Sequence, residues 1–257
     1  MAEITRREKQ NVAILVTSQT LFMIASITVM TLSGVVGQQL SSEPSLATLP
    51  IAMMMIGTVI STLPASLYMK RVGRRLGFVT GATLGGVAGG LLSFIAIALG
   101  SFWLFCAANL LLGLYQGFAM YYRFAAADVA SPAFRSRAIS WVMAGGVVAA
   151  FLGPWNASAG SQLLASVPLG GPYLVIAALA FCAIGLLTQL RVPMSGEPQP
   201  GETSRAMGEI AALPTFKVAI IAAALGYAIM VLVMTATPLA MRARGFEMSD
   251  VAFIMQW

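Results

Sequence analysis

Long apolar stretches separated by short polar or charged ones run along the whole chain. A membrane-spanning helix needs about 20 mostly apolar residues, because each residue advances ~1.5 Å across a hydrocarbon core of ~30 Å. Strands of a membrane barrel are shorter and alternate apolar with polar residues, and these stretches do not. We predict seven spanning helices and the start of an eighth, over residues 12–40, 48–69, 76–99, 102–126, 138–164, 172–190, 216–240 and from 251 onward.

The composition agrees with this pattern and excludes a soluble protein. Of the 257 residues, 58% are hydrophobic and 9% are charged, whereas a soluble domain carries roughly 25% charged residues. The chain has no His and two Cys, which argues against a His-liganded zinc or haem site and against a Cys₄ cluster. We expect an all-α polytopic membrane protein with no metal site and no cofactor.

The placement of Lys and Arg predicts how the helices are oriented. The net charge is +6, and cytoplasmic loops of membrane proteins carry an excess of basic residues. If the N-terminus is cytoplasmic, 13 of the 15 basic residues lie on that side and only Arg242 and Arg244 lie outside. We predict a multi-pass protein of the cytoplasmic (plasma) membrane, surrounded by lipid and with no nucleic-acid partner. The 13 residues are Arg6, Arg7, Lys9, Lys70, Arg71, Arg74, Arg75, Arg123, Arg135, Arg137, Arg191, Arg205 and Lys217.

One polar stretch, residues 191–215, divides the chain. It is rich in Pro and Gly and is the longest connection on the predicted cytoplasmic side. Six helices, a polar linker and then more helices is the plan of transporters built from repeated bundles. We expect a six-helix bundle over residues 1–190, a cytoplasmic linker over 191–215, and the start of a second bundle over 216–257. In this interpretation the chain is truncated, and the C-terminal helical bundle is a missing partner.

Three sequence motifs resemble those of the major facilitator superfamily. The connection after the second predicted helix contains the pattern R-x-G-R-R, which is half of the signature loop G-x-L-a-D-R-x-G-R-R. Its alternative interpretation is an ordinary basic loop. Three positions depart from the signature: Ser66, Tyr68 and Lys70 replace Gly, Leu and the acidic residue. The matching positions are Arg71, Gly73, Arg74 and Arg75.

The fourth predicted helix and its exit add to the resemblance. Gly113, Gln116 and Gly117 follow the R-x-x-Q-G pattern of this family, with Gly113 in the Arg position. The connection that follows is similar to the family's loop into the fifth helix. It contains Asp128, Arg135 and Arg137.

The fifth predicted helix resembles the G-x-x-x-G-P motif, with Ala149 in the first Gly position and Gly153 and Pro154 after it. Small residues recur every four positions from Gly145 to Ala157, and such a face lets another helix approach closely. In the family this motif seals the outer side against the second bundle, often in antiporters. The alternative is ordinary small-residue packing.

The resemblance implies a carrier of twelve helices in two halves, with a central cavity lined by helices 1, 2, 4, 5 and 7. Polar residues within those helices are therefore candidate substrate contacts. Residues seven apart share a helix face, and two such rows lie on helices 1 and 4. The candidates are Gln19, Ser26, Asn109, Gln116, Arg123, Asn156 and Tyr227.

Two of these candidates have a structural alternative. Gln116 falls near the middle of its span and is the strongest candidate, but a hydrogen bond between helices is the alternative for it. Arg123 either attracts an anionic group or extends its guanidinium to the cytoplasmic surface.

We predict a secondary active transporter that moves a small organic solute or drug by alternating access, with export or antiport as the direction that the motif in helix 5 favours. No Asp or Glu lies in any predicted span, which argues against a membrane-bound enzyme, because such an enzyme needs buried acid–base residues. The alternative is a non-transporting receptor or scaffold with a carrier-like fold.

The predicted topology can be tested by thiol labelling. We expect a cysteine introduced as Ser195→Cys to react with a membrane-impermeant reagent only from the cytoplasmic side, and Ser42→Cys only from outside, because the hydrocarbon core blocks the reagent. The reverse labelling pattern would overturn the orientation.

Overall fold

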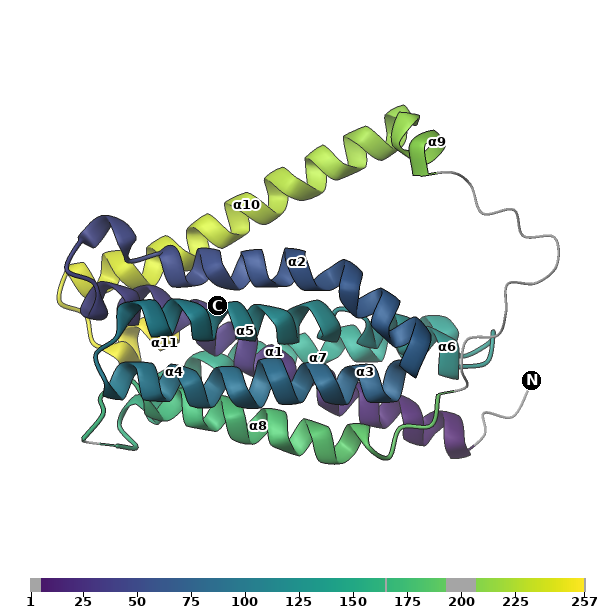
Figure 1. Ribbon diagram of the computed structural model, residues 1–257, viewed down its shortest axis with the longest axis horizontal. Helices are drawn as coiled ribbons and strands as arrows, with labels where there is room; N and C mark the ends of the chain where they lie inside the picture. Colours follow the sequence, from purple (N-terminus) through teal and green to yellow (C-terminus); the bar gives the residue numbers. More distant parts are fainter. Residues whose placement is uncertain (1–5, 165, 193–206, 257) are drawn as a thin grey trace.

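The computed structural model describes residues 6–164, 166–192 and 207–256 (Figure 1). Throughout these residues the regular structure is helical. The helices are α1 (Arg6–Leu40), η1 (Pro44–Leu46), α2 (Leu49–Val72), α3 (Arg74–Gly81), η2 (Ala82–Val87), α4 (Ala88–Ala98), α5 (Phe102–Ala119), α6 (Tyr122–Val129), α7 (Arg135–Ser161), α8 (Gly171–Leu187), α9 (Met207–Ala212), α10 (Pro214–Ala243) and α11 (Met248–Met255).

These helices confirm the predicted all-α polytopic membrane fold. Six helical segments of the described chain are long and apolar enough to cross a membrane, and α8 is a shorter apolar helix. The third span combines α3, η2 and α4, and the fourth combines α5 and α6. Each of the seven predicted spans therefore coincides with one helix or with a continuous set of helices.

Helix α1 lies at the centre of the bundle and contacts α2, α5, α6, α7, α8 and α10. Its apolar residues Leu15, Phe22 and Leu32 are buried against neighbouring helices, and so are its polar residues Thr28 and Ser33. Helices α2, α5, α7 and α8 and the span formed by α3, η2 and α4 run beside it along the length of the bundle (Figure 1).

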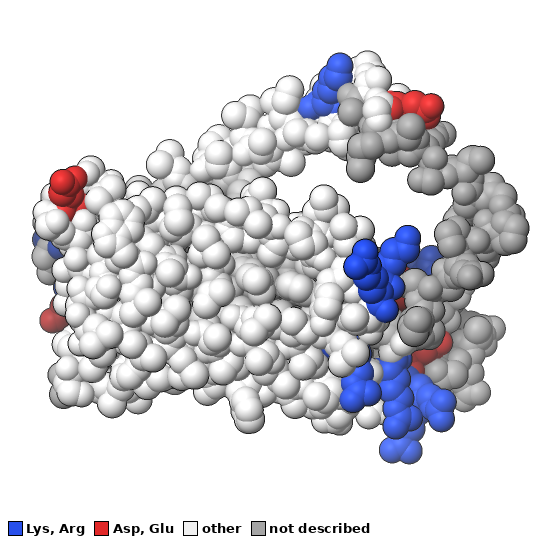
Figure 2. Space-filling view, in the orientation of Figure 1, with Lys and Arg blue, Asp and Glu red and all other residues white. Residues whose placement is uncertain are grey.

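The basic residues gather at the end of the bundle where α1 begins (Figures 1 and 2). We call this end the basic end. It holds the start of α1, the α2–α3 connection, the α6–α7 connection and the residues after α8. The described basic residues at the other end are Arg242 and Arg244, where α10 finishes.

Glycine allows α2 and α5 to cross closely. A Cβ atom at Gly113 of α5 would overlap the carbonyl oxygen of Met54, and one at Gly57 of α2 would overlap the carbonyl oxygen of Leu110. Small residues at such crossings let the backbones of membrane helices come together, which is a main source of their packing energy.

The third span contains a π-helical segment, η2, where it packs on α5 and α8. A Cβ atom at Gly86 would lie 3.0 Å from the Tyr115 ring and 2.6 Å from the Cβ of Ala180. Gly85 lies against the backbone of α5. The glycines of this span therefore make room for a buried tyrosine within the bundle.

The small-residue face of α7 packs against α1. Ala149 and Ala157 are fully buried on this face. A Cβ atom at Gly145 would lie 2.5 Å from Oγ1 of Thr20, and one at Gly153 would lie 2.6 Å from Cγ2 of Ile27. Within the described residues, the close partner of this motif is a helix of the same bundle. The sealing role that the resemblance implies stays a prediction.

Helix α10 leans away from the bundle over most of its length (Figure 1). It meets α1 near its C-terminal end, where the Leu239 side chain lies against Gly34. Helix α11 packs on α7, and the Gln256 amide donates to the Phe151 carbonyl. In the predicted linker, residues 193–206 lie outside the described part, and α9 and the start of α10 occupy the remainder.

The packing of α7 on α1 predicts the effect of added volume at Gly153. We expect Gly153→Leu to lower the thermal stability of the detergent-solubilised protein, by about 1–3 kcal/mol, because the larger side chain collides with Ile27. Gly185→Leu on α8 is the matched control, since a Cβ atom there meets no neighbour within 4 Å. Equal melting temperatures for the two variants would contradict this packing role.

Candidate functional site

Gln19 and Ser26 of α1 and Gln116 of α5 share one side of the bundle, which we call the polar seam. All three side chains are half-buried. The rings of Phe22 and Tyr115 pack edge to face with centroids 5.1 Å apart. Because α1 and α5 run antiparallel, this contact places Gln116 at a level between Gln19 and Ser26.

The contacts of its neighbours on α5 fix the direction of Gln116. Gly113 and Gly117 lie against α2, while Tyr115 lies against α1. Gln116 therefore emerges between α1 and α2. Its Oε1 atom is buried and has no hydrogen-bond partner among the described residues. An unpaired polar atom in hydrocarbon is costly, so this oxygen has an unmet capacity to accept a hydrogen bond.

Asn109, one of the predicted contacts, is instead enclosed by its own bundle. Its side chain is 0% exposed. The Ser33 hydroxyl donates to its Oδ1 over 3.0 Å, and its Nδ2 donates to the Phe105 carbonyl over 2.9 Å. The Ser33 hydroxyl also lies 3.0 Å from the Tyr173 hydroxyl. This amide links α1, α5 and α8.

Asn156 of α7 has a similar place. Its Nδ2 donates to the Thr28 hydroxyl over 3.2 Å and lies 3.5 Å from the Pro172 carbonyl. The Thr28 hydroxyl in turn reaches the Gly153 carbonyl over 3.0 Å. Asn156 thereby connects α7 with α1 and α8. Buried amides that already have partners hold helices together, and this distinguishes both asparagines from Gln116.

Arg123 and Tyr227 lie on two other helices, α6 and α10. The Arg123 guanidinium is exposed on α6, 4.9 Å from the centre of the Phe124 ring. The Tyr227 hydroxyl of α10 donates to the sulfur of Met55 over 3.7 Å, and its side chain is 45% exposed. Tyr227 thus presents an aromatic surface beside α2.

The motif residues of the basic end form a connected group. Arg74 makes an ion pair with Asp128, which joins the start of α3 to the end of α6. Arg135 Nε donates to the Ala127 carbonyl over 3.2 Å. Gly73 ends α2 with a φ of +87°, a left-handed conformation that other residues adopt only with strain. Arg71 and Arg137 are exposed nearby.

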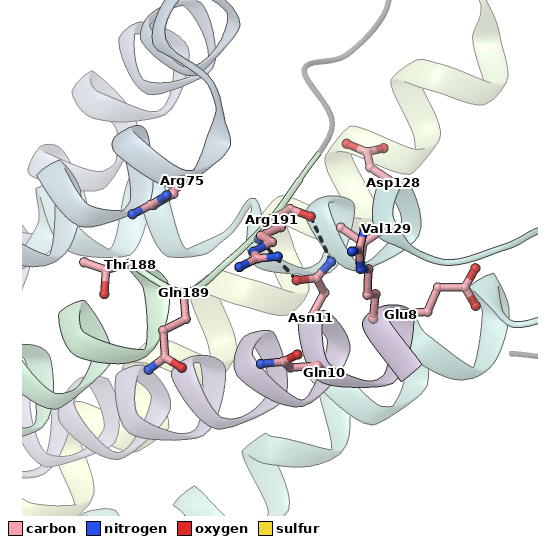
Figure 3. Close-up of a pocket in the computed structure, with 10 residues that line it drawn as sticks. Glu8, Gln10, Asn11, Arg75, Asp128, Val129, Thr188, Gln189 and Arg191 are labelled. Carbon is pink, nitrogen blue, oxygen red and sulfur yellow. Dashed lines mark hydrogen bonds between the residues drawn. The ribbon is translucent and has the colours of Figure 1, made fainter. Parts of the chain in front are cut away.

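A cavity of about 670 Å³ opens beside this group (Figure 3). On its wall, Asn11 Nδ2 donates to the Arg191 carbonyl over 2.8 Å, and the Arg191 N–H donates to Asn11 Oδ1 over 3.2 Å. This cavity is not among the sites that the sequence predicts. The available signal was the cluster of polar residues at the ends of the first and sixth spans. The lining residues are Arg7, Glu8, Gln10, Asn11, Arg75, Asp128, Val129, Thr188, Gln189 and Arg191.

The side chains of the polar seam suit recognition by hydrogen bonding. They are amides and a hydroxyl, and they carry no charge. Across the described ranges, no three His, Cys, Asp or Glu side chains come together as metal ligands.

Comparison with known proteins connects the fold and these motifs to a family. The family model described as Major Facilitator Superfamily matches residues 14–256. The riboflavin transporter RfnT of Brucella anthropi is 38% identical over 251 residues, which are 97% of this chain and 63% of that protein. The uncharacterized MFS-type transporter YdeG of Bacillus subtilis (strain 168) is 28% identical over 244 residues, 88% of this chain and 55% of that protein.

The chain thus spans less than two thirds of the length of both curated relatives. The family match runs from the first spanning helix to α11. It includes the R-x-G-R-R connection, the Gln116 helix and the small-residue face of α7. The chain is a multi-pass membrane protein that belongs to the major facilitator superfamily of transporters.

Proposed function

We propose that this protein is a secondary transporter, working by alternating access, for a small heterocyclic solute of the flavin type. One structural observation carries the proposal. The Oε1 atom of Gln116 lies near the middle of a membrane span and is buried without a hydrogen-bond partner among the described residues. The similarity to a riboflavin transporter over 97% of the chain supports the choice of solute class.

The chemistry of a flavin ring matches a glutamine amide. One edge of the ring carries an imide N–H between two carbonyl oxygens. A glutamine side chain offers one acceptor and two N–H donors, so Gln116 can accept from the imide and donate to a carbonyl. Ligand sites combine mostly apolar walls with a few polar groups. In the polar seam, Gln19 and Ser26 add further polar groups, and the exposed Tyr227 ring offers a stacking surface.

Alternating access requires a second wall opposite the polar seam. In transporters of this kind, one bundle rocks against another around a central site. We propose that α10 and α11 begin the second bundle, with residues 1–190 as the first bundle and 191–215 as the linker between them. In this proposal the basic end faces the cytoplasm of the cell and the protein lies in the plasma membrane, as the distribution of Lys and Arg favours.

Export or antiport is the direction that the α7 motif favours. Flux measured both into and out of vesicles tests this direction. A non-transporting receptor is the alternative function, and saturable flux of solute would exclude it.

The proposed role of Gln116 predicts a specific loss of transport. We expect Gln116→Leu, in the full reading frame that contains this chain, to lower the efficiency of riboflavin transport by about fivefold to hundredfold, because the loss of hydrogen bonds at a buried site costs about 1–3 kcal/mol. Transport is measured as riboflavin flux into and out of vesicles made from cells that lack their own riboflavin transporter. Gln162→Leu, at the exposed end of α7, is the matched control and is expected to transport normally. Wild-type efficiency in Gln116→Leu would remove this residue from the site.

The buried asparagine predicts a different result. We expect Asn109→Leu to lower the melting temperature and the yield of folded protein. The substitution removes the Oδ1 atom that accepts from the Ser33 hydroxyl, and the loss of this hydrogen bond costs about 1–3 kcal/mol. The KM of the protein that does fold should stay close to that of the wild type. A raised KM with unchanged stability would instead place Asn109 in the substrate site.

A further inference from the structure

The cavity at the basic end brings together three guanidinium groups from separate parts of the chain. Arg7 lies in the first turn of α1, Arg75 in the first turn of α3, and Arg191 directly after α8. In Figure 3, Arg75 and Arg191 lie on opposite sides of the cavity, with Thr188 and Gln189 below Arg75. The reciprocal hydrogen bonds with Asn11 fix the backbone of Arg191 to α1.

The charges of this cavity do not cancel one another. Asp128 forms an ion pair with Arg74, and the Arg74 side chain does not line the cavity. None of the guanidiniums of Arg7, Arg75 and Arg191 makes an ion pair or side-chain hydrogen bond within the described part of the chain. Three guanidinium groups and two carboxylates therefore line the cavity, and Asp128 is already paired with a fourth arginine, Arg74.

We propose that this cavity binds a phosphate-bearing anion, with the glycerophosphate headgroup of an acidic lipid as the occupant that its position favours. A guanidinium binds phosphate oxygens in a bidentate manner. A volume of about 670 Å³ is in the range of small-ligand sites. The Gln10 amide in the lining supplies further N–H donors.

The level of the cavity along the helices favours the lipid source. Val12, only five residues after Arg7, is already fully buried among apolar side chains of the bundle. Leu187 and Leu190 are equally buried just before Arg191. The three arginines therefore lie where the spans leave the hydrocarbon, at the depth of the lipid headgroups. Basic pockets between membrane helices at this depth bind acidic headgroups.

The competing explanation is that these arginines serve only to set topology. That role depends on the number of basic residues on one side of the membrane and does not need a cavity. Arg6 and Lys9 of α1 and Lys217 of α10 are also basic residues, but they do not line the cavity. Removing either set of three subtracts the same charge, so the two explanations give different results.

The test compares two triple variants of the full reading frame, reconstituted in nanodiscs that contain equal amounts of phosphatidylglycerol and phosphatidylcholine. Native mass spectrometry then counts the lipids that stay bound after mild delipidation. We expect wild type to retain phosphatidylglycerol selectively. The triple variant Arg7→Gln, Arg75→Gln, Arg191→Gln should retain at least about tenfold less phosphatidylglycerol, because each arginine contributes severalfold to binding an acidic headgroup. Arg6→Gln, Lys9→Gln, Lys217→Gln should retain as much as wild type.

Two additional measurements keep the test decisive. Gln189→Glu adds a carboxylate to the lining with little change in shape, and it should weaken phosphatidylglycerol retention without altering the circular dichroism spectrum. Thermal unfolding in lipid-free detergent with inorganic phosphate tests for a soluble occupant. Phosphate could stabilise wild type but not the cavity variant, while both proteins retain the same amount of phosphatidylglycerol. That result would support an anion site in the cavity and would overturn the lipid headgroup as its occupant. Equal behaviour of the two triple variants in both assays would overturn the proposal.

Discussion

The absence of water from hydrocarbon is the constraint on which this structure depends. A polar group inside a membrane needs a protein partner, since none is available from the solvent. At two buried residues of α1 this need is met by hydrogen bonds between helices: Thr28 reaches the backbone of α7, and Ser33 reaches both α5 and α8. Such short bonds require close helices, and the glycines at Gly145 and Gly153 of α7 provide that closeness. Small residues and paired polar groups are therefore two parts of one arrangement.

The same constraint gives Gln116 its significance. Asn109 and Asn156 are also amides within membrane spans, and both are paired within the bundle. Gln116 lies one helical turn after Gly113, yet its Oε1 atom has no partner in the described part of the chain. The bundle thus pairs the amides of Asn109 and Asn156 and leaves the Oε1 atom of Gln116 unpaired. In the function proposed above, a solute that passes through the membrane is its partner.

Much of the fold could be predicted from the sequence, because the length and hydropathy of a span follow directly from the thickness of the membrane. The motifs also placed Arg74 and Asp128 at one end of the bundle, where the structure joins them. Spacing of seven residues put Asn109 and Gln116 on one helix face, but spacing alone does not separate a paired amide from an unpaired one. That distinction depends on Ser33, 76 positions away in the chain. The cavity at the basic end could not be predicted for a similar reason. The sequence alone does not distinguish a basic residue that sets topology from one that lines a cavity.

The basic end and the polar seam are also connected through the fourth membrane span, which α5 and α6 form. Helix α5 ends at Ala119, and α6 begins at Tyr122 and continues to Val129. Asp128, near the end of α6, is held by its ion pair with Arg74. On the other side of the break, Gly113 and Gly117 hold α5 against α2. The glycine contacts therefore hold the helix segment of Gln116, and the ion pair holds the segment that follows the break. Holding an amide in place before a solute arrives lowers the entropic cost of binding, and in the proposed function the glycine contacts beside Gln116 provide that preorganisation.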